Sequence, residues 1–325
     1  MKYWHYYFVT STLFIVFISL LAWLAVPAFS QSDEPEAFVS PLPKGSTLSE
    51  NNQVRVLDFF IPFIEKLQGK SGDDFAPTSK AVLMYDLVNN KTLYEKNARE
   101  TLPMASLTKI MTAIIALENP LLSDQYLVKS EHLVGEDSMG LTAGEILTLE
   151  ELLYGLMLPS GNDASEVLAG HFPGGRSAFL QAMNNKALAL GLTDTRFSNP
   201  SGLQGDGTQY TTARDLLVIT KYVLDNFPLF REVVQTFSHE IPATSTHKYF
   251  YLENATNLIS TYPGVKGVKT GFTPEAGLCL VTYLEYGGHK VVGILLGSEN
   301  RRMEMKDLLD YSLEKLGTPP PPFES

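Results

Sequence analysis

The strongest constraint on the fold of this chain is the distribution of strand-like and helical segments along it. Near the start of the main body, two alternating segments flank Val88-Asn89-Asn90, where paired asparagines tolerate the positive φ angles of a tight turn. A second hairpin pattern lies near the end, joined through Tyr286-Gly287-Gly288-His289. Because strands do not alternate with helices as in βαβ units, the sequence predicts an α+β fold whose terminal strands share one antiparallel sheet. The predicted strands are 81–87, 91–95, 265–269, 278–285 and 290–296.

The middle of the chain has helical periodicity, with apolar residues recurring at intervals of three and four. Two of the predicted helices carry start signals. Thr148 with Glu151 matches a capping box, and Thr212 with Asp215 matches a related pattern. The predicted helices are 107–117, 149–158, 164–171, 178–190, 213–225 and 304–316.

Composition excludes several classes of function. Hydrophobic residues make up 44% and charged residues 19% of the 325 residues, as is usual for a soluble globular body. The 36 acidic residues outnumber the 25 basic ones, and no run of Lys or Arg interrupts the net charge of -11, so nucleic acid is not an expected partner. The one cysteine, Cys279, cannot form an intramolecular disulfide, and its apolar neighbours predict a buried strand residue.

The first thirty residues differ from the rest. Between Lys2 and Asp33 there is no charged residue, and the apolar stretch 8–26 is long enough for one membrane crossing. Ala28-Phe29-Ser30 could also serve as the cleavage site of a secretory signal. The length of the apolar stretch favours an uncleaved anchor, and Lys2 favours a cytoplasmic N-terminus. Either alternative places the body outside the cytoplasmic membrane, membrane-anchored or secreted.

The remaining boundaries follow from composition. Residues 31–50 are rich in Ser, Pro and Glu, as in a linker. Residues 318–325 form a Pro-rich tail that cannot continue a helix. The sequence therefore predicts a signal peptide or N-terminal membrane anchor at 1–30, the linker, and one catalytic domain at 51–317.

Ser106 and Lys109 are three residues apart at the start of a predicted helix, so their side chains are expected on one face. A serine hydroxyl becomes a strong nucleophile only when a base removes its proton, and lysine is a base only when neutral. With an ordinary pKa near 10.4, neutralising lysine at pH 7 costs roughly 4.6 kcal/mol. The site must therefore lower this pKa by burial or by a second nearby cation. The alternative interpretation of these two residues is structural, with Ser106 simply at the N-terminus of the helix and Lys109 pointing outward into solvent.

Two further motifs contain groups that suit the same chemistry. Ser160-Gly161-Asn162 lies in a short loop between predicted helices, where hydroxyl and amide groups can donate and accept hydrogen bonds. Lys269-Thr270-Gly271 ends a predicted strand and combines a cation, a hydroxyl and a residue without Cβ. Each motif alone could be an ordinary loop or strand terminus. The order S-x-x-K, S-x-N, K-T-G is typical of penicillin-binding proteins and class A β-lactamases.

The surroundings of these motifs make the chain resemble the low-molecular-mass penicillin-binding proteins of the D-alanyl-D-alanine carboxypeptidase family. The resemblance runs from about Ala76 to Gly317, and Gly161 stands where class A β-lactamases usually have Asp. It implies a five-stranded antiparallel sheet flanked by helices, with a helical lobe. The segments that carry it are 103–109 (PMASLTK), 158–164 (LPSGNDA), 195–203 (TRFSNPSGL) and 269–273 (KTGFT).

The resemblance implies a serine acyl-enzyme mechanism on peptidoglycan stem peptides ending in D-Ala-D-Ala. Ser106 would attack the penultimate D-Ala carbonyl, and Lys109 would accept its proton. The amides of Ser106 and Phe272 would form the oxyanion hole. Ser160 would relay a proton to the leaving amine, and Asn162 would orient Lys109 and hold the substrate amide.

The resemblance also assigns substrate binding to Lys269, Thr270, Gly271 and Phe272, with Lys269 and Thr270 on the terminal carboxylate. It implies β-lactams as covalent inhibitors and requires neither a metal nor another cofactor. This chain departs from the family's pattern at Lys266, where many members have an acidic residue and where we expect a solvated surface charge. The family's β-rich second domain and C-terminal amphipathic helix do not follow the body, so we expect the N-terminal segment to attach the protein to the cytoplasmic membrane.

Three alternative functions remain open at this point. A D,D-endopeptidase that cuts peptidoglycan crosslinks has the same motifs. A β-lactamase needs an additional deacylating glutamate, and Glu166, four residues after Asn162, is expected to be only a charge on a helix face. A non-catalytic module that binds β-lactams or wall fragments has no need of all four residues Ser106, Lys109, Ser160 and Lys269.

Overall fold

The computed structural model describes residues 77–203 and 207–323. The expectations for the N-terminal segment 1–30 and the linker 31–50 lie outside the described residues. Within the described ranges, no helix combines the length and the apolar character that a bilayer crossing requires.

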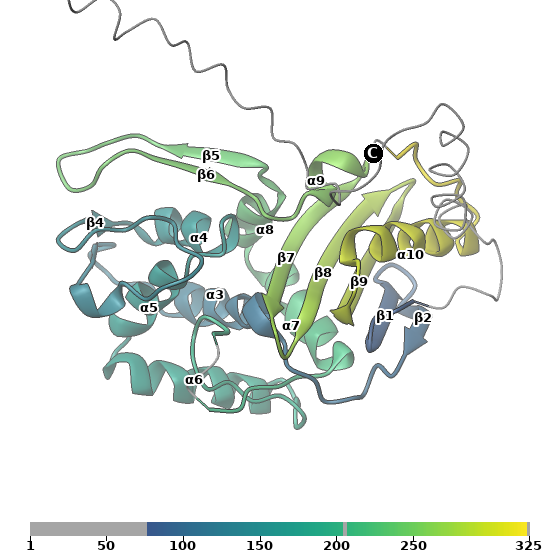
Figure 1. The fold of residues 1–325 in the computed structure, drawn as a ribbon, viewed down its shortest axis with the longest axis horizontal. Coiled ribbons are helices and arrows are strands. Elements are labelled where there is room, and N and C mark those ends of the chain that lie inside the picture. Colours follow the sequence, from purple (N-terminus) through teal and green to yellow (C-terminus); the bar gives the residue numbers. More distant parts are fainter. Residues whose placement is uncertain (1–76, 204–206, 324–325) are drawn as a thin grey trace, which may run out of the picture. The chain divides into compact units, whose positions relative to one another are not determined.

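Among the described residues, five strands form one antiparallel sheet in the order β2-β1-β9-β8-β7, shown in Figure 1. The N-terminal hairpin joins the C-terminal strands through β1 and β9, where Ala81 pairs with Leu296. Both hairpins and their common sheet are therefore confirmed. The strands are β1 (Ala81–Asp86), β2 (Lys91–Lys96), β7 (Val265–Thr273), β8 (Gly277–Tyr286) and β9 (His289–Ser298).

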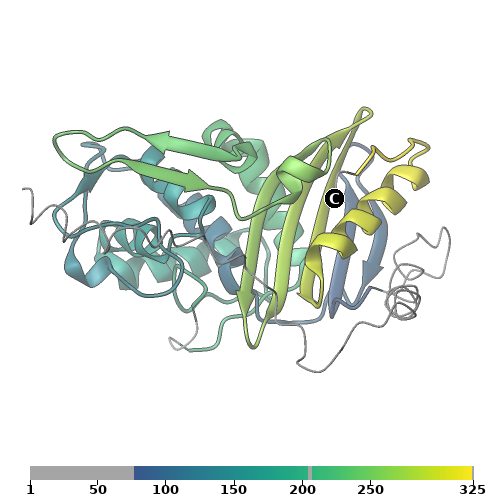
Figure 2. The same ribbon diagram turned by 45° about the horizontal axis from the view of Figure 1, so that its top comes forward.

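Helices cover both faces of the sheet (Figures 1 and 2). On one face lies α10 (Arg301–Lys315), whose apolar side chains pack with Met84 of β1 in one core. On the other face lie α7 (Ala213–Asn226) and α8 (Pro228–Gln235), which share a larger core with Leu83. Successive residues of β1 thus enter different cores, because side chains alternate across a strand. The sequence analysis missed α8, a short helix with Pro228 in its first turn.

The helical lobe lies beside β7. The capping box that starts α4 is confirmed, since Thr148 Oγ1 accepts a hydrogen bond from the Glu151 amide and the Glu151 carboxylate accepts one from the Thr148 amide. The predicted helix 107–117 begins later than expected, because a 3-10 turn, η3 (Ala105–Thr108), precedes it. The helices of the lobe are α3 (Lys109–Glu118), α4 (Leu149–Met157), α5 (Asn162–Gly170) and α6 (Gly175–Ala189).

A hairpin that the sequence analysis missed, β5 (Ser238–Ile241) with β6 (Phe250–Glu253), packs against α4. The His239 ring stacks on Tyr154, with ring centroids 3.6 Å apart. Just after β6, the Ala255 amide donates a hydrogen bond to the Leu158 carbonyl and so ties this segment to the loop after α4. The remaining short elements are β3 (Tyr126–Leu127), η4 (Ser130–His132), β4 (Ile146–Leu147) and α9 (Leu258–Thr261).

Candidate active site

Ser106 and Lys109 lie at the junction of η3 and α3. Ala105 has a positive φ of 48°, and the tight turn that follows places Ser106 one turn before Lys109. Lys109 Nζ lies 3.0 Å from Ser106 Oγ. The structure therefore brings the hydroxyl and the amine within hydrogen-bonding distance, as the spacing of the two residues predicts.

Lys109 is fully buried, and its amine has two further partners. Nζ lies 2.7 Å from Asn162 Oδ1 and 2.7 Å from the Ser201 carbonyl oxygen. Both atoms accept hydrogen bonds and cannot donate them. A neutral amine can donate one proton to each and keep its lone pair for a third partner, so Ser106 is the partner that can give Lys109 a proton.

The surroundings of Lys109 favour this neutral form. Burial lowers the pKa of Lys109 well below its usual value, and the positive charge of Lys269 lowers it further. The carboxylates of Asp137, Asp163 and Glu136 oppose this shift without reversing it. Desolvation is the largest cause, and the second cation that the chemistry calls for is the lysine of the K-T-G motif.

The Ser160-Gly161-Asn162 segment forms a strained turn between α4 and α5. Ser160 has a positive φ of 68°, and its hydroxyl is buried without a hydrogen-bond partner among the described residues. A Cβ on Gly161 would lie 2.8 Å from the Gly155 carbonyl oxygen, so only glycine fits there. Asn162 is the first residue of α5, and its backbone amide donates a hydrogen bond to the Asp137 carbonyl. The hydroxyl of Ser160 thus has hydrogen-bonding capacity that no described residue uses.

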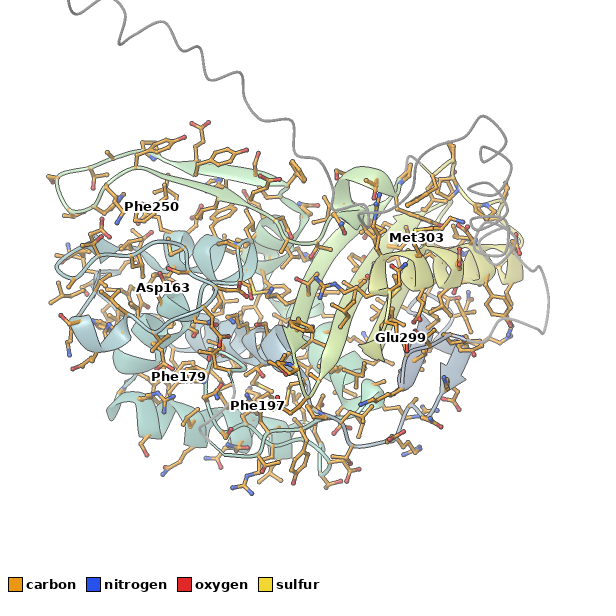
Figure 3. The ribbon with its side chains drawn as sticks, in the orientation of Figure 1. Asp163, Phe179, Phe197, Phe250, Glu299 and Met303 are labelled. Carbon is orange, nitrogen blue, oxygen red and sulfur yellow. The ribbon has the colours of Figure 1, made fainter. Side chains whose placement is uncertain are left out.

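Asp163 fixes the loop beside this turn. Its Oδ1 accepts from the Met139 amide at 3.0 Å, and its Oδ2 accepts from the Leu141 amide at 3.0 Å and the Gly140 amide at 3.2 Å. Figure 3 shows Asp163 in the helical lobe, where it is buried. A buried carboxylate with several backbone donors holds the loop rigidly and so supports the position of Asn162.

The K-T-G residues lie inside β7 and not at its end, because the strand continues to Thr273. The predicted strand end at Lys269 was therefore wrong. Pairing of Thr270 with Leu280 and of Phe272 with Leu278 on β8 extends the ladder. An ideal Cβ on Gly271 would lie 3.0 Å from the Ser106 amide nitrogen, so the missing side chain lets β7 pass close to Ser106.

Lys269 is buried, and its Nζ donates to the carbonyl of Thr270 at 3.0 Å. Burial lowers the pKa of Lys269 to about 7, with a further contribution from the charge of Arg301, while Asp137 opposes the shift. The neighbouring Phe272 side chain is 61% exposed. Beside the buried lysine, the strand therefore offers an exposed apolar surface.

Two contributors had no role in the sequence analysis. Gly202 has φ of +92°, and a Cβ there would lie 2.1 Å from the Ala105 carbonyl oxygen, so the loop that supplies the Ser201 carbonyl packs directly on the η3 turn that contains Ser106. Arg301, at the start of α10, donates from Nη1 to the Gly271 carbonyl at 2.8 Å. Both contacts depend on the tertiary structure. In the sequence, Gly202 was visible only as part of the 195–203 segment, and nothing around Arg301 pointed to the site.

Three other expectations can be compared with the structure. Cys279 is fully buried, as predicted. Glu166 is also buried and accepts two hydrogen bonds from Arg176, at 2.7 and 3.1 Å, so it is not a charge on an open helix face. Lys266 is partly exposed but forms an ion pair with Glu285 at 2.9 Å, so it is not freely solvated. In the described part of the chain, no group of three or more His, Cys, Asp or Glu side chains could hold a metal ion.

The sheet, the helical lobe and the serine–lysine pair between them define a serine acyl-transfer enzyme of the penicillin-binding class. The model of the D-alanyl-D-alanine carboxypeptidase family, Peptidase S11, matches residues 69–300. The chain belongs to this family.

Curated relatives and solved structures agree with this assignment. D-alanyl-D-alanine carboxypeptidase DacF of Bacillus subtilis is 33% identical over 278 residues, covering 82% of this chain and 70% of the relative. A D-alanyl-D-alanine endopeptidase of Escherichia coli is 35% identical over 215 residues, covering 62% of this chain and 66% of the relative. The crystal structure of the Streptomyces K15 DD-transpeptidase superposes with a TM-score of 0.70 at 31% identity, covering 75% of this chain and all of the other. The expected fold is thereby confirmed.

Proposed function

We propose that the chain removes the terminal D-Ala from peptidoglycan stem peptides through an acyl-enzyme at Ser106. The observation that carries the proposal is the 3.0 Å contact between Ser106 Oγ and the fully buried Nζ of Lys109. Because the other partners of this amine only accept hydrogen bonds, a neutral Lys109 is arranged to take the serine proton.

In the proposed reaction, Ser106 Oγ forms a bond to the carbonyl carbon of the penultimate D-Ala while its proton passes to Lys109. The Ser106 and Phe272 amides, on η3 and β7, would stabilise the oxyanion. The C–N bond to the terminal D-Ala then breaks, and the proton reaches the leaving amine through the hydroxyl of Ser160, which is buried and unpartnered within the described residues. Water attacks the ester and restores Ser106.

The terminal carboxylate of the substrate would lie against Lys269 and Thr270. A buried ammonium with only one carbonyl partner among the described residues is poorly compensated, and an incoming carboxylate supplies the missing charge. Gly271 would let the peptide approach the backbone of β7, and Phe272 would offer its exposed ring to an apolar part of the substrate. Asn162 would hold both Lys109 and the substrate amide.

The decisive experiment measures free D-Ala released from an acylated L-Lys-D-Ala-D-Ala peptide by the purified protein and by Ser106→Ala. We expect release by the native protein alone. The same peptide ending in L-Ala-L-Ala is the control substrate. Absence of D-Ala release by a folded native protein would contradict the carboxypeptidase assignment.

A D,D-endopeptidase is the second candidate, because a relative of that name is 35% identical to this chain. It would use the same residues and differ in the room left beyond the leaving D-Ala. Chromatography of a crosslinked muropeptide dimer after incubation separates the two activities: a carboxypeptidase leaves the dimer intact, whereas an endopeptidase yields monomers.

Two further alternatives receive less support. In a β-lactamase, Glu166 would have to activate the deacylating water, but its two oxygens are occupied by Arg176. A non-catalytic binding module would not need a buried lysine beside a serine hydroxyl, since burying a cation is costly unless the site uses it. Slow release of a bound penicillin, measured against the turnover of the D-Ala-D-Ala peptide, distinguishes these alternatives from the carboxypeptidase.

For its location, we propose that the protein acts outside the cytoplasm and is held at the membrane by residues 8–26. This apolar stretch is the segment of the sequence that is long enough for a crossing. We expect the membrane fraction of cells to contain the chain with residues 1–30 attached. An N-terminus at Gln31 on a soluble extracytoplasmic protein would instead establish a cleaved signal.

A further inference from the structure

A polar pocket of about 380 Å³ lies where α7 and α8 meet the ends of β7, β8 and β9. None of its lining residues belongs to the candidate active site. Its apolar wall consists of Leu87, Leu224 and Val234, and most of the remaining lining is charged. A volume of this size falls within the range of small-molecule sites. The charged residues that line it are Lys221, Asp225, Arg231, Lys266, Glu285 and Lys290.

The carboxylate of Glu285 is already neutralised inside the pocket. It forms ion pairs with Lys266 at 2.9 Å and with Lys290 at 3.4 Å, and it accepts a hydrogen bond from the Tyr283 hydroxyl. These donors lower the pKa of Glu285 to about 2, and the Tyr283 hydroxyl makes the largest contribution. Glu285 therefore stays ionised at neutral pH. One carboxylate thus faces two ammonium groups, and one positive charge remains.

A second positive charge remains at Arg231. Lys221 pairs with Asp225 on the same helix, one turn apart. Arg231 is exposed, and its guanidinium makes no ion pair or hydrogen bond with any residue that the structure describes, although it lies near the Tyr283 hydroxyl. The pocket therefore carries an excess of two positive charges on a chain whose formal net charge is -11.

This arrangement suits a phosphate group better than a carboxylate. A phosphate monoester carries about 1.5 to 2 negative charges at neutral pH and has three acceptor oxygens. The cationic groups come from different walls of the pocket, with Arg231 on α8, Lys221 on α7 and Lys290 on β9, so separate oxygens can meet separate donors. Guanidinium groups bind phosphate through two parallel hydrogen bonds.

We propose that this pocket binds the phosphate group of an organic phosphate ester or diester, with Arg231 as its main ligand and Lys290 as the second. The pocket is larger than a phosphate ion, and its apolar wall leaves room for the carbon skeleton of the ligand. Such a group could come from a small phosphate ester or from a phosphodiester polymer of the cell envelope. The proposal does not depend on the reaction at Ser106.

Calorimetric titration of the full-length protein with glycerol 3-phosphate and with a short poly(glycerol phosphate) chain tests the proposal. We expect saturable binding that weakens with added salt. Arg231→Gln should weaken binding at least tenfold. Arg214→Gln removes the same charge from an arginine on α7 that pairs with Glu95 outside this pocket, and it should change the affinity less than twofold. Lys290→Gln, also at an exposed position, provides a second variant, and thermal unfolding checks the fold of each.

The outcomes separate the sources of the ligand. Tighter binding of the polymer than of glycerol 3-phosphate points to an envelope polymer, and equal or weaker binding points to a small ester. Three results would overturn the proposal: no binding of either probe, an equal loss of affinity in Arg231→Gln and Arg214→Gln, or succinate binding as tightly as glycerol 3-phosphate.

Discussion

Asn162 Oδ1 lies 2.7 Å from Lys109 Nζ, although the two residues are 53 positions apart in the chain. This contact joins the start of α5 to the start of α3. Asn162 Oδ1 and the Ser201 carbonyl oxygen both accept hydrogen bonds from the Lys109 amine. Among the described partners of this amine, only the Ser106 hydroxyl can donate a proton to it. This geometry supports the proposal that Lys109 acts as a base rather than as a fixed positive charge.

Lys109→Arg tests this distinction. Arginine keeps the charge and much of the length but cannot be deprotonated in a protein, so we expect acylation by a fluorescent penicillin to fall at least a thousandfold, on the order of what a general base contributes. Lys186→Arg is the matched control, because Lys186 pairs with Glu118 outside the site and arginine can keep that pair. Rapid acylation of a folded Lys109→Arg variant would exclude Lys109 as the base.

Ser106→Ala should abolish covalent labelling by penicillin, because the acyl bond forms on its Oγ. Ser130→Ala, at an exposed serine of η4, should be labelled like the native protein. Mass spectrometry of the labelled peptide checks the position. Stoichiometric labelling of Ser106→Ala would assign the nucleophile elsewhere.

Gly202→Ala should impair the site through sterics. A Cβ at Gly202 would lie 2.1 Å from the Ala105 carbonyl oxygen, so either the η3 turn that contains Ser106 or the loop that supplies the Ser201 carbonyl must move. We expect acylation to fall about a hundredfold, since small displacements of reacting groups have effects of this order.

Gly288→Ala is the control for Gly202→Ala. Gly288 has a similar φ of +82°, but a Cβ there meets no atom within 4 Å. Gly288→Ala should lower the free energy of unfolding by about 1 to 2 kcal/mol, because alanine disfavours the left-handed backbone conformation. It should leave the acylation rate unchanged. Equal acylation rates in the two variants would remove the steric argument.

The pH dependence of kcat/KM should have a falling limb near pH 7. The pKa of Lys269 lies at about 7, so this lysine is charged below that pH and neutral above it. The peptide carboxylate stays ionised throughout, and its attraction to the free enzyme is therefore lost as the pH rises through 7. A peptide with a C-terminal carboxamide has no such charge and should lack this limb. Identical profiles for the two peptides would rule out a carboxylate contact of Lys269.

Asp163→Asn should destabilise the fold by about 3 kcal/mol. The amide keeps the shape of the side chain but has one acceptor oxygen instead of two, so backbone amides such as that of Leu141 lose a buried partner, at about 1 to 3 kcal/mol each. Asp194→Asn, at an exposed position, should change the free energy of unfolding by less than about 0.5 kcal/mol. Chemical denaturation measures both variants, and equal stabilities would contradict the role of Asp163.

The sequence by itself determined the elements whose signals are local. Alternation and turn residues predicted the hairpins β1–β2 and β8–β9, and the capping residues Thr148 and Thr212 marked two helix starts. The spacing of Ser106 and Lys109 also predicted their contact, because three residues make about one turn.

Only the tertiary structure decided the features that depend on distant parts of the chain. The loop at Ser201 and the side chain of Arg301 reach the site from far along the chain, and no local pattern encodes such contacts. The extension of β7 beyond Lys269 depends on pairing with β8. The lowered pKa of Lys109 arises from burial and from Lys269, both products of packing. Desolvation lowers the pKa of a lysine only once the surrounding chain has excluded water. The sequence could therefore indicate that Lys109 requires a lowered pKa, but only the folded structure produces that shift.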